Sequence, residues 1–337
     1  MQLRNMTIYS IFVRNHGGKF AVIEKDIPRI KALGVDMIWL LPIHPIGKKQ
    51  RKGRLGSPYA IADYRSVNPE YGSMEDFRHF ADVVHASGMK LMIDVVYNHT
   101  SPDSWLAQHH PEWFYHKPDG SFGNRIGDWS DIIDLDYSQP GLWDYQIETL
   151  KMWAEVVDGF RCDVAPLVPL SFGPRLHEFI RALFDREKAR FLFTVGESGV
   201  HDIDEMIRHC AAERNELSTL FLFDHMECGR ADKFTKKADT LKSLRDILVY
   251  WQQETANHDL LHTLFSDNHD QSPLISRIAD DGKLRYESAT DLATIGKRIH
   301  FPVLIVARSR RQIGGEAHCK IAQRHGPVHA GDEPDNA

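Results

Sequence analysis

The chain has 337 residues, 42% of them hydrophobic and 26% charged, and its formal net charge at pH 7 is −6. This length can bury a core as one large α/β domain or as two smaller domains. The acidic balance, without a basic cluster interleaved with aromatic residues, argues against nucleic acid as a partner. No apolar run approaches the ~20 residues that cross a bilayer, and residues 1–10 hold no signal-peptide core, so we expect a cytoplasmic protein without membrane contact.

Short apolar runs alternate with amphipathic stretches along most of the chain, which is typical of repeated βα units with a parallel sheet. The predicted strands are 7–13, 37–43, 90–96, 159–164, 191–195, 217–223, 260–265 and 301–307, and the predicted helices are 21–34, 73–88, 142–157, 174–189 and 241–256. Gly34, Gly88 and Gly159 stand where the first three helices are expected to be capped. No phosphate-binding glycine loop follows the first strand, so the α/β pattern favours a (β/α)8 TIM barrel.

One interval, residues 100–141, breaks this rhythm because it is rich in aromatic and turn residues and shows no amphipathic helix. Long insertions in compact domains are usually functional or have a small fold of their own. We therefore predict a barrel of residues 1–99 and 142–307 with an insertion at 100–141, after the third strand and on the active-site face. Residues 308–337 are weakly periodic and are predicted to be a disordered or truncated tail.

Charged and polar residues gather at the C-terminal ends of four predicted strands. They are Asp94, Asn98 and His99; Arg161 and Asp163; Glu197; and Asp267, His269 and Asp270. In a barrel these ends converge on one rim, so the side chains are predicted to share one pocket. Alternation along a strand places Arg161 and Asp163 on the same face and turns Cys162 to the opposite face.

Paired carboxylates in different protonation states are what the cleavage of a glycosidic bond requires. Arg161 favours the ionised form of Asp163, which makes Asp163 the better nucleophile. Glu197 follows an apolar strand and has the more desolvated setting, which makes it the better acid. The residues alone therefore indicate a glycosidase, although a single buried ion pair would be equally compatible with a structural role.

Four ordered motifs carry a specific resemblance: DVVYNHT (94–100), GFRCDVA (159–165), VGES (195–198) and FSDNHD (265–270). Together with LLPIHPIG and SPYAIADY near the start, they resemble the signature regions of the α-amylase family, glycoside hydrolase family 13, over about residues 5–275. The resemblance implies a retaining mechanism, with Asp163 as nucleophile, Glu197 as general acid/base and Asp270 stabilising the transition state. It implies sugar contacts from Tyr59, His99, Arg161 and His269, with Asp94 supporting the site from behind.

The implied reaction is hydrolysis of α-1,4-glucosidic bonds in starch-derived glucans or maltodextrins. A cyclomaltodextrinase, a neopullulanase or a glucosyltransferase of the same family would use the same residues. A different class, a catalytically silent glucan-binding protein, also stays open. Ala60 after Tyr59 favours internal cleavage, because exo-acting α-glucosidases of the family tend to carry an aspartate there.

Two features depart from the family pattern. Many members bind a structural calcium ion, and Asn98 and Asp134 match two of its ligands, but Leu167 stands where a histidine is usual. No cofactor is expected for the chemistry itself, and calcium remains an alternative with few of the six to eight oxygens that the ion needs. The usual C-terminal β-sandwich domain is not recognisable in the sequence. The oligomeric state is not predicted.

Overall fold

The computed structural model describes residues 6–125, 129–164, 193–200, 204, 207, 210, 219–222, 249–255, 257–258, 262–265 and 303–308. In the ranges 193–200, 219–222, 262–265 and 303–308 it describes the backbone, and the burial of Gly196 and Leu220 alone. The predicted helix at 174–189 and the predicted tail beyond Arg308 lie outside these residues. Within them, no helix has the length and apolar character needed to cross a bilayer.

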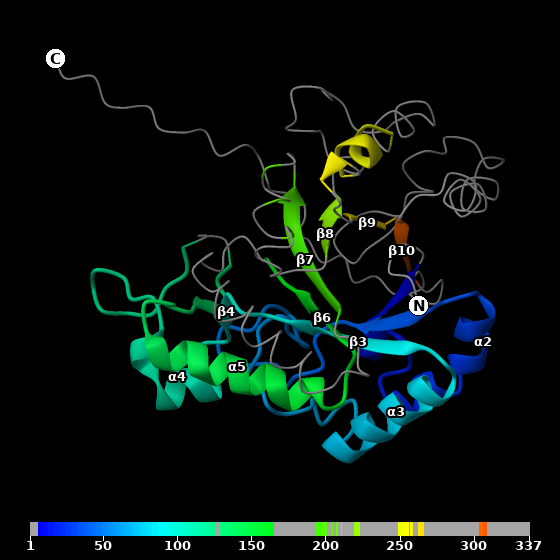
Figure 1. Cartoon of the computed structure of the whole chain (residues 1–337). Coiled ribbons are helices and arrows are strands. Elements are labelled where there is room, and N and C mark those ends of the chain that lie inside the picture. The colour runs from blue at the N-terminus through cyan, green and yellow to red at the C-terminus, as the bar shows by residue number, and fades with distance from the viewer. Residues whose placement is uncertain are drawn as a thin grey trace, which may run out of the picture.

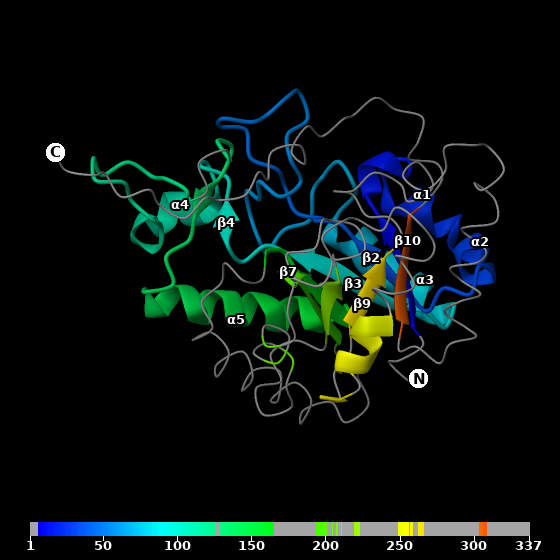
Figure 2. The same ribbon diagram turned by 90° about the horizontal axis from the view of Figure 1, so that it is seen from above.

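A barrel of eight parallel strands forms the centre of the molecule (Figures 1 and 2). The strands are β1 (Thr7–Ile11), β2 (Met37–Leu40), β3 (Lys90–Val95), β6 (Gly159–Cys162), β7 (Phe193–Val200), β8 (Thr219–Leu222), β9 (His262–Phe265) and β10 (Val303–Arg308). They are ordered β1-β10-β9-β8-β7-β6-β3-β2, and β1 pairs with both β2 and β10, which closes the sheet. Each strand overlaps one predicted run, so the predicted TIM barrel is confirmed.

The strands near the site are buried along their whole length. Every residue of β2 and β6 is buried, and only the first residue of β3 is partly exposed. Parallel strands covered on both faces read as nearly continuous apolar runs, which explains why these segments were recognisable. A charged residue inside such a strand must be paired, because an unpaired buried charge is strongly unfavourable. The two charges that interrupt these runs, Asp94 and Arg161, lie on neighbouring strands.

The long helix α3 (Met74–Ala86) covers the outside of β3, as predicted (Figure 1). Ser73 caps its N-terminus in a capping box with Asp76. Gly88 follows its end with φ of 75°, in the left-handed region where glycine is favoured, and Gly34 has φ of 80°. Gly159 does not cap a helix, which corrects our prediction: it opens β6, and the preceding helix ends at Ala154, with Glu155 as its C-cap.

The single helix predicted at 21–34 is instead two short helices, α1 (Phe20–Glu24) and α2 (Ile27–Ala32). The cause is Pro28, which lacks the N–H that would donate to the carbonyl of Glu24 and whose ring clashes with that carbonyl. At the start of a new helix the same residue is tolerated. A 3₁₀ turn, η2 (Val13–Asn15), connects β1 to this region.

The insertion after β3 contains regular structure of its own: β4 (His99–Thr100), α4 (Trp105–His109), the 3₁₀ turn η3 (Pro111–Trp113) and β5 (Ile133–Asp134). The short helix α4 was not expected. Strands β4 and β5 form a two-stranded antiparallel sheet separate from the barrel. Helix α5 (Pro140–Ala154) then leads back to β6, as predicted, and its Tyr145 ring stacks on the ring of Trp105 in α4, with the ring centres 5.9 Å apart. The division into barrel and insertion domains stays a prediction.

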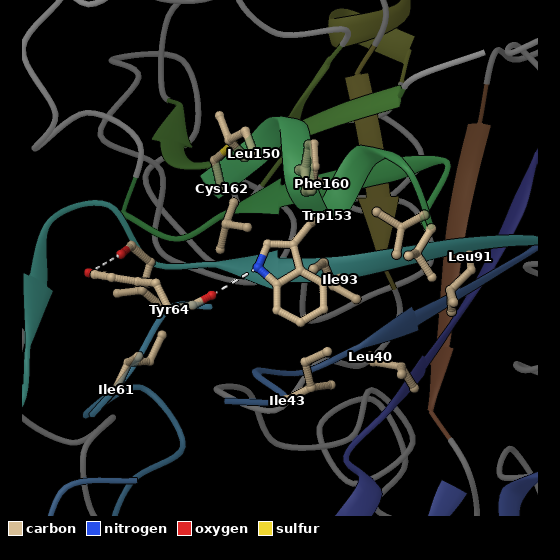
Figure 3. Close-up of a cluster of buried hydrophobic side chains, with 14 of the residues drawn as sticks. Leu40, Ile43, Ile61, Tyr64, Leu91, Ile93, Leu150, Trp153, Phe160 and Cys162 are labelled. Carbon is tan, nitrogen blue, oxygen red and sulfur yellow. Dashed lines mark hydrogen bonds between the residues drawn. The ribbon is translucent and has the colours of Figure 1, made fainter. Parts of the chain in front are cut away.

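A buried cluster around Trp153 joins α5 to the loop between β2 and α3 (Figure 3). The indole Nε1 of Trp153 donates to the carbonyl of Tyr64 at 2.8 Å. The hydroxyl of Tyr64 in turn lies 2.6 Å from the carbonyl of Val96 and 2.8 Å from that of His99. The segment that leaves β3 is therefore held from behind by the hydrophobic core, and with it the backbone of His99.

Candidate active site

The centre of the site is an ion-pair network between β3 and β6. Arg161 lies directly opposite Asp94 in the register of these two strands. Its Nη1 donates to Asp94 Oδ1 at 3.0 Å and to Asp163 Oδ1 at 2.7 Å. The side chains of Arg161, Asp94 and Asp163 are 1%, 0% and 9% exposed. Arg161 and Asp163 thus share a face, as the alternation predicted, and one guanidinium holds two carboxylates.

Aromatic side chains complete the surroundings of Arg161. The hydroxyl of Tyr59 donates to Asp94 Oδ2 at 3.0 Å, so each oxygen of this carboxylate has a donor. The guanidinium carbon of Arg161 lies 5.3 Å from the ring centre of Trp39 and 5.9 Å from that of Tyr59. Aromatic faces attract a cation at such distances. Trp39 was not among the predicted site residues, although its place inside the second predicted strand was the signal that could have found it.

Asp163 follows directly after β6 and continues its line. Its backbone N–H donates to the carbonyl of Val95 at 2.9 Å, so the residue keeps the β3 register although it is no longer part of the strand. The next residue, Val164, has φ of 39°. A β-branched residue in the left-handed region costs about 1–3 kcal/mol and persists where the surroundings enforce it, often at functional sites.

Strand β7, which carries Glu197, pairs with β6, the strand that Asp163 follows. In the register of β6 and β7, Arg161 pairs with Val195 and Cys162 with Gly196, and Asp163 and Glu197 are the next residues along the two segments. Neighbouring strands lie about 4.8 Å apart. The register of β7 with β8 shifts between Gly196 and Val200, an irregularity of the kind found next to active sites. We expected Glu197 after the strand, whereas it lies within β7.

His99 is buried at the start of the insertion, on β4, and is 4% exposed. Burial lowers its pKa to about 4, so the ring is neutral near pH 7. The amide Nδ2 of Asn98 lies 3.2 Å from His99 Nδ1. Because an amide nitrogen only donates, Nδ1 accepts and Nε2 carries the proton. The ring of Trp129 lies 5.6 Å from the ring of His99, centre to centre, and adds an aromatic wall from the insertion.

The predicted partners Asp267, His269 and Asp270 lie outside the described residues, which stop at Phe265, the last residue of β9, and resume at Val303. The site that the structure describes therefore consists of Asp94, Arg161 and Asp163 in contact, with Tyr59 on Asp94. His99 belongs to the neighbouring β4 and β5 sheet.

The predicted calcium ligands Asn98 and Asp134 meet at the β4 and β5 sheet, where Leu135 donates its N–H to the Asn98 carbonyl. Asp134 Oδ1 and Asn124 Oδ1 are buried without a hydrogen-bond partner, which is typical of oxygens that hold a cation. These two residues and Asn98 nevertheless supply fewer side-chain oxygens than the six to eight that calcium needs. In the described part of the chain, no group of three or more His, Cys, Asp or Glu residues could hold a metal ion. A nitrogen of Arg125 already lies 3.6 Å from Asp134 Oδ2, so these residues do not fit calcium.

Stability should fall in mild acid because two histidines are buried in the neutral form. Burial lowers the pKa of His44, as of His99, to about 4. The unfolded chain titrates near the ordinary value of 6.5, so it binds more protons than the folded chain between about pH 4 and 6.5. The free energy of unfolding therefore falls as pH is lowered through this window, by about 2 kcal/mol per histidine between about pH 7 and 5.

Urea denaturation of His44→Asn at several pH values checks this prediction, because asparagine keeps a donor for the Ser66 carbonyl that His44 Nδ1 contacts at 3.0 Å. The wild type should lose about 2 kcal/mol more than His44→Asn between about pH 7 and 5. The exposed His109→Asn is the matched control and should follow the wild type. Parallel profiles for His44→Asn and the wild type would refute the assigned burial effect.

A family model described as the alpha amylase catalytic domain matches residues 11–120 and 109–300 of the chain. The chain belongs to the alpha-amylase family. An alpha-amylase from Lactobacillus plantarum has a similar solved structure, with a TM-score of 0.75 and 39% sequence identity, covering 92% of this chain and 72% of that protein. The recognition from the four motifs is thereby confirmed.

Curated relatives of this alpha-amylase family member are glycosidases by name. A probable oligo-1,6-glucosidase 2 of Bacillus subtilis is 26% identical, over 87% of this chain and 62% of the relative. A trehalose-6-phosphate hydrolase of the same organism is 28% identical, over 81% of this chain and 57% of the relative. The chain thus spans about three fifths of the length of these relatives. The predicted enzyme class, a glycosidase, agrees with them, whereas their names do not single out α-1,4 bonds.

Proposed function

We propose that this alpha-amylase family member is a retaining glycoside hydrolase that cleaves α-glucosidic bonds in starch-derived oligosaccharides. The observation that carries the proposal is the buried network in which Arg161 joins Asp94 to Asp163, at the end of the strand that pairs with β7, on which Glu197 lies. Carboxyl groups about 5–5.5 Å apart are typical of retaining glycosidases, and we expect this separation between Asp163 and Glu197. The substrate is a malto-oligosaccharide or a related α-glucan.

In the first half of the proposed reaction, a carboxylate oxygen of Asp163 attacks the anomeric carbon and forms a glycosyl ester. Arg161 stabilises the ionised carboxylate, because a neighbouring cation favours the charged form. Its contact at 2.7 Å also fixes the direction in which the carboxylate points. Asp94 holds the guanidinium from the other side and is itself held by Tyr59, so Asp94 acts through Arg161 and not on the sugar.

Glu197 gives its proton to the leaving glycosidic oxygen and then takes a proton from the water that hydrolyses the ester. Asp270, from the resemblance, stabilises the distorted sugar in the transition state. His99, neutral near pH 7, offers its Nε2–H to a sugar hydroxyl, and His269 is proposed for a similar contact. The proposed chemistry needs no cofactor.

The bond that is cleaved is the finer part of the proposal. The predicted α-1,4 cleavage is supported by the solved alpha-amylase, the most identical of the three relatives described. The second candidates follow from the names of the curated relatives: cleavage of an α-1,6 bond, or hydrolysis of trehalose 6-phosphate. Ala60 supports internal cleavage. A cyclomaltodextrinase, a neopullulanase and a glucosyltransferase use the same catalytic groups and differ in their products.

Chromatographic product analysis tests the proposal, with maltoheptaose, isomaltotriose, β-cyclodextrin, pullulan and trehalose 6-phosphate supplied separately. Shorter malto-oligosaccharides from maltoheptaose are the expected result. Cleavage of isomaltotriose alone would mean an α-1,6-glucosidase, and cleavage of trehalose 6-phosphate alone would mean a trehalose-6-phosphate hydrolase. Products longer than the substrate would indicate glucosyl transfer. Turnover of none of them, together with a melting temperature raised by maltoheptaose, would identify a silent glucan-binding protein.

A further inference from the structure

Arg125 makes a set of contacts in the insertion that no proposed sugar contact requires. Its backbone N–H donates to Asp134 Oδ2 at 2.7 Å, and its Nη1 lies 3.6 Å from the same oxygen. Nη1 also donates to the carbonyl of Leu135 at 3.3 Å. The guanidinium carbon lies 4.6 Å from the ring centre of Tyr115, which fixes the group from a third direction. Arg125 thus has several partners, although its side chain is half exposed.

Asp134 needs a positive neighbour. Its side chain is 3% exposed, and an ionised carboxylate in such a place is strongly unfavourable unless a cation or several donors compensate it. Two sources of that charge are conceivable in this family: a calcium ion, as the resemblance implies, or a side chain. The described residues offer too few oxygens for the ion, whereas Arg125 is already in place.

The position matters because Asp134 is paired with His99 in the β4 and β5 sheet. The same two segments are joined by the hydrogen bond from Leu135 N–H to the Asn98 carbonyl at 2.9 Å. Arg125 contacts both Asp134 and Leu135. A displacement of β5 would therefore be passed to β4, which carries the proposed sugar contact.

We propose that Arg125 supplies at Asp134 the positive charge that the family resemblance assigns to calcium, and that it thereby positions His99. The protein then folds and keeps its stability without calcium. Arg125 is a positioning residue, since it acts through Asp134 and β4. The stability part of the proposal is independent of the reaction, whereas the effect on His99 rests on the proposed function.

The alternative is a calcium ion bound by Asp134 Oδ1 and Asn124 Oδ1, which are buried without a hydrogen-bond partner. If they hold an ion, a chelator should lower the melting temperature of the wild type and millimolar calcium should restore it. If Arg125 carries the charge, neither treatment should move the melting temperature by more than about 1 °C. This comparison uses the unmodified full chain and needs no variant.

Thermal melts of Arg125→Gln and Arg125→Lys, with the exposed Arg78→Gln as matched control, complete the test. Arg125→Gln should lower the melting temperature by about 3–8 °C, because it leaves a buried carboxylate uncompensated. Arg125→Lys should recover more than half of this loss, since it keeps the charge, and Arg78→Gln should stay within about 1 °C of the wild type. If Arg125→Gln does not fold, Arg125→Lys and the chelator experiment still decide.

Kinetics on maltoheptaose separate positioning from simple stabilisation. Below the melting transition, Arg125→Gln should raise KM by about 5-fold or more with kcat changed less than 2-fold, as expected when a sugar contact shifts. Unchanged KM and kcat would remove the effect on His99 and leave the stability claim intact. A wild type that is stabilised by calcium, or an Arg125→Gln variant that melts with the control, would overturn the proposal. Absence of all glucan turnover would count against the proposed function and not against the melting results.

Discussion

Replacing Asp163 with asparagine should lower kcat/KM on maltoheptaose on the order of 10⁴-fold or more while the protein stays folded. The amide is nearly the same size as the carboxylate and keeps an oxygen that accepts from Arg161 Nη1 at the 2.7 Å position, so the network loses a charge but little packing. An amide oxygen is a poor nucleophile, so the covalent glycosyl ester does not form. Reducing-sugar release and far-ultraviolet circular dichroism measure the two expectations.

Glu197→Gln should cause a similar loss for a different reason, and added azide separates the two roles. On α-glucosyl fluoride, whose leaving group needs little protonation, the Glu197 variant still forms the ester, and azide can then replace water to give an α-glucosyl azide. An Asp163→Ala variant should instead let azide attack directly and give the β-azide. Exposed Asp82→Asn is the matched control and should keep wild-type activity. Full activity in the Asp163 variant would remove the proposed nucleophile.

Arg161→Met should have the largest expected effect on stability. The substitution leaves Asp94 and Asp163 buried with no guanidinium, and breaking a buried ion pair by removing one partner costs about 3–5 kcal/mol. Methionine fills much of the apolar volume between Trp39 and Tyr59, so the loss reports charge more than packing. Urea denaturation measures the change in the free energy of unfolding.

The double variant Arg161→Met/Asp94→Asn provides the control for that interpretation. Removing the charge of Asp94 removes one of the two uncompensated carboxylates, so the double variant should recover about 1–2 kcal/mol of the loss. Activity should stay low, because Asp163 still lacks its cation. The exposed Arg78→Met should change stability by about 0.5 kcal/mol or less. Additive losses in the double variant would mean that the two side chains are not energetically coupled.

The sequence predicted the barrel well because its strands are apolar on both faces and bounded by turn residues. It also predicted that Arg161 and Asp163 lie together, since this follows from alternation within one strand. The prediction failed at two helix boundaries, which depend on the local backbone conformation. The helix at 21–34 breaks because of Pro28, and Gly159 begins a strand instead of ending a helix.

Contacts between distant segments were the part that the sequence could not supply. The hydrogen bond from Tyr59 to Asp94 and the position of Trp39 under Arg161 depend on how separate loops and strands meet. The contacts of Arg125 in the insertion are of the same kind. They join residues nine and ten positions apart across a loop whose apolar residues follow no regular period, so no pattern in the sequence predicted them.

The most direct test of the central claim, that Asp163 and Glu197 act as a nucleophile and acid/base pair, is the configuration of the first product. Proton NMR during early hydrolysis of maltoheptaose distinguishes the α- and β-anomers before they interconvert. Two displacements at the anomeric carbon, through an ester on Asp163, predict that the α-anomer appears first. First appearance of the β-anomer would mean a single displacement by water and would contradict the role assigned to Asp163.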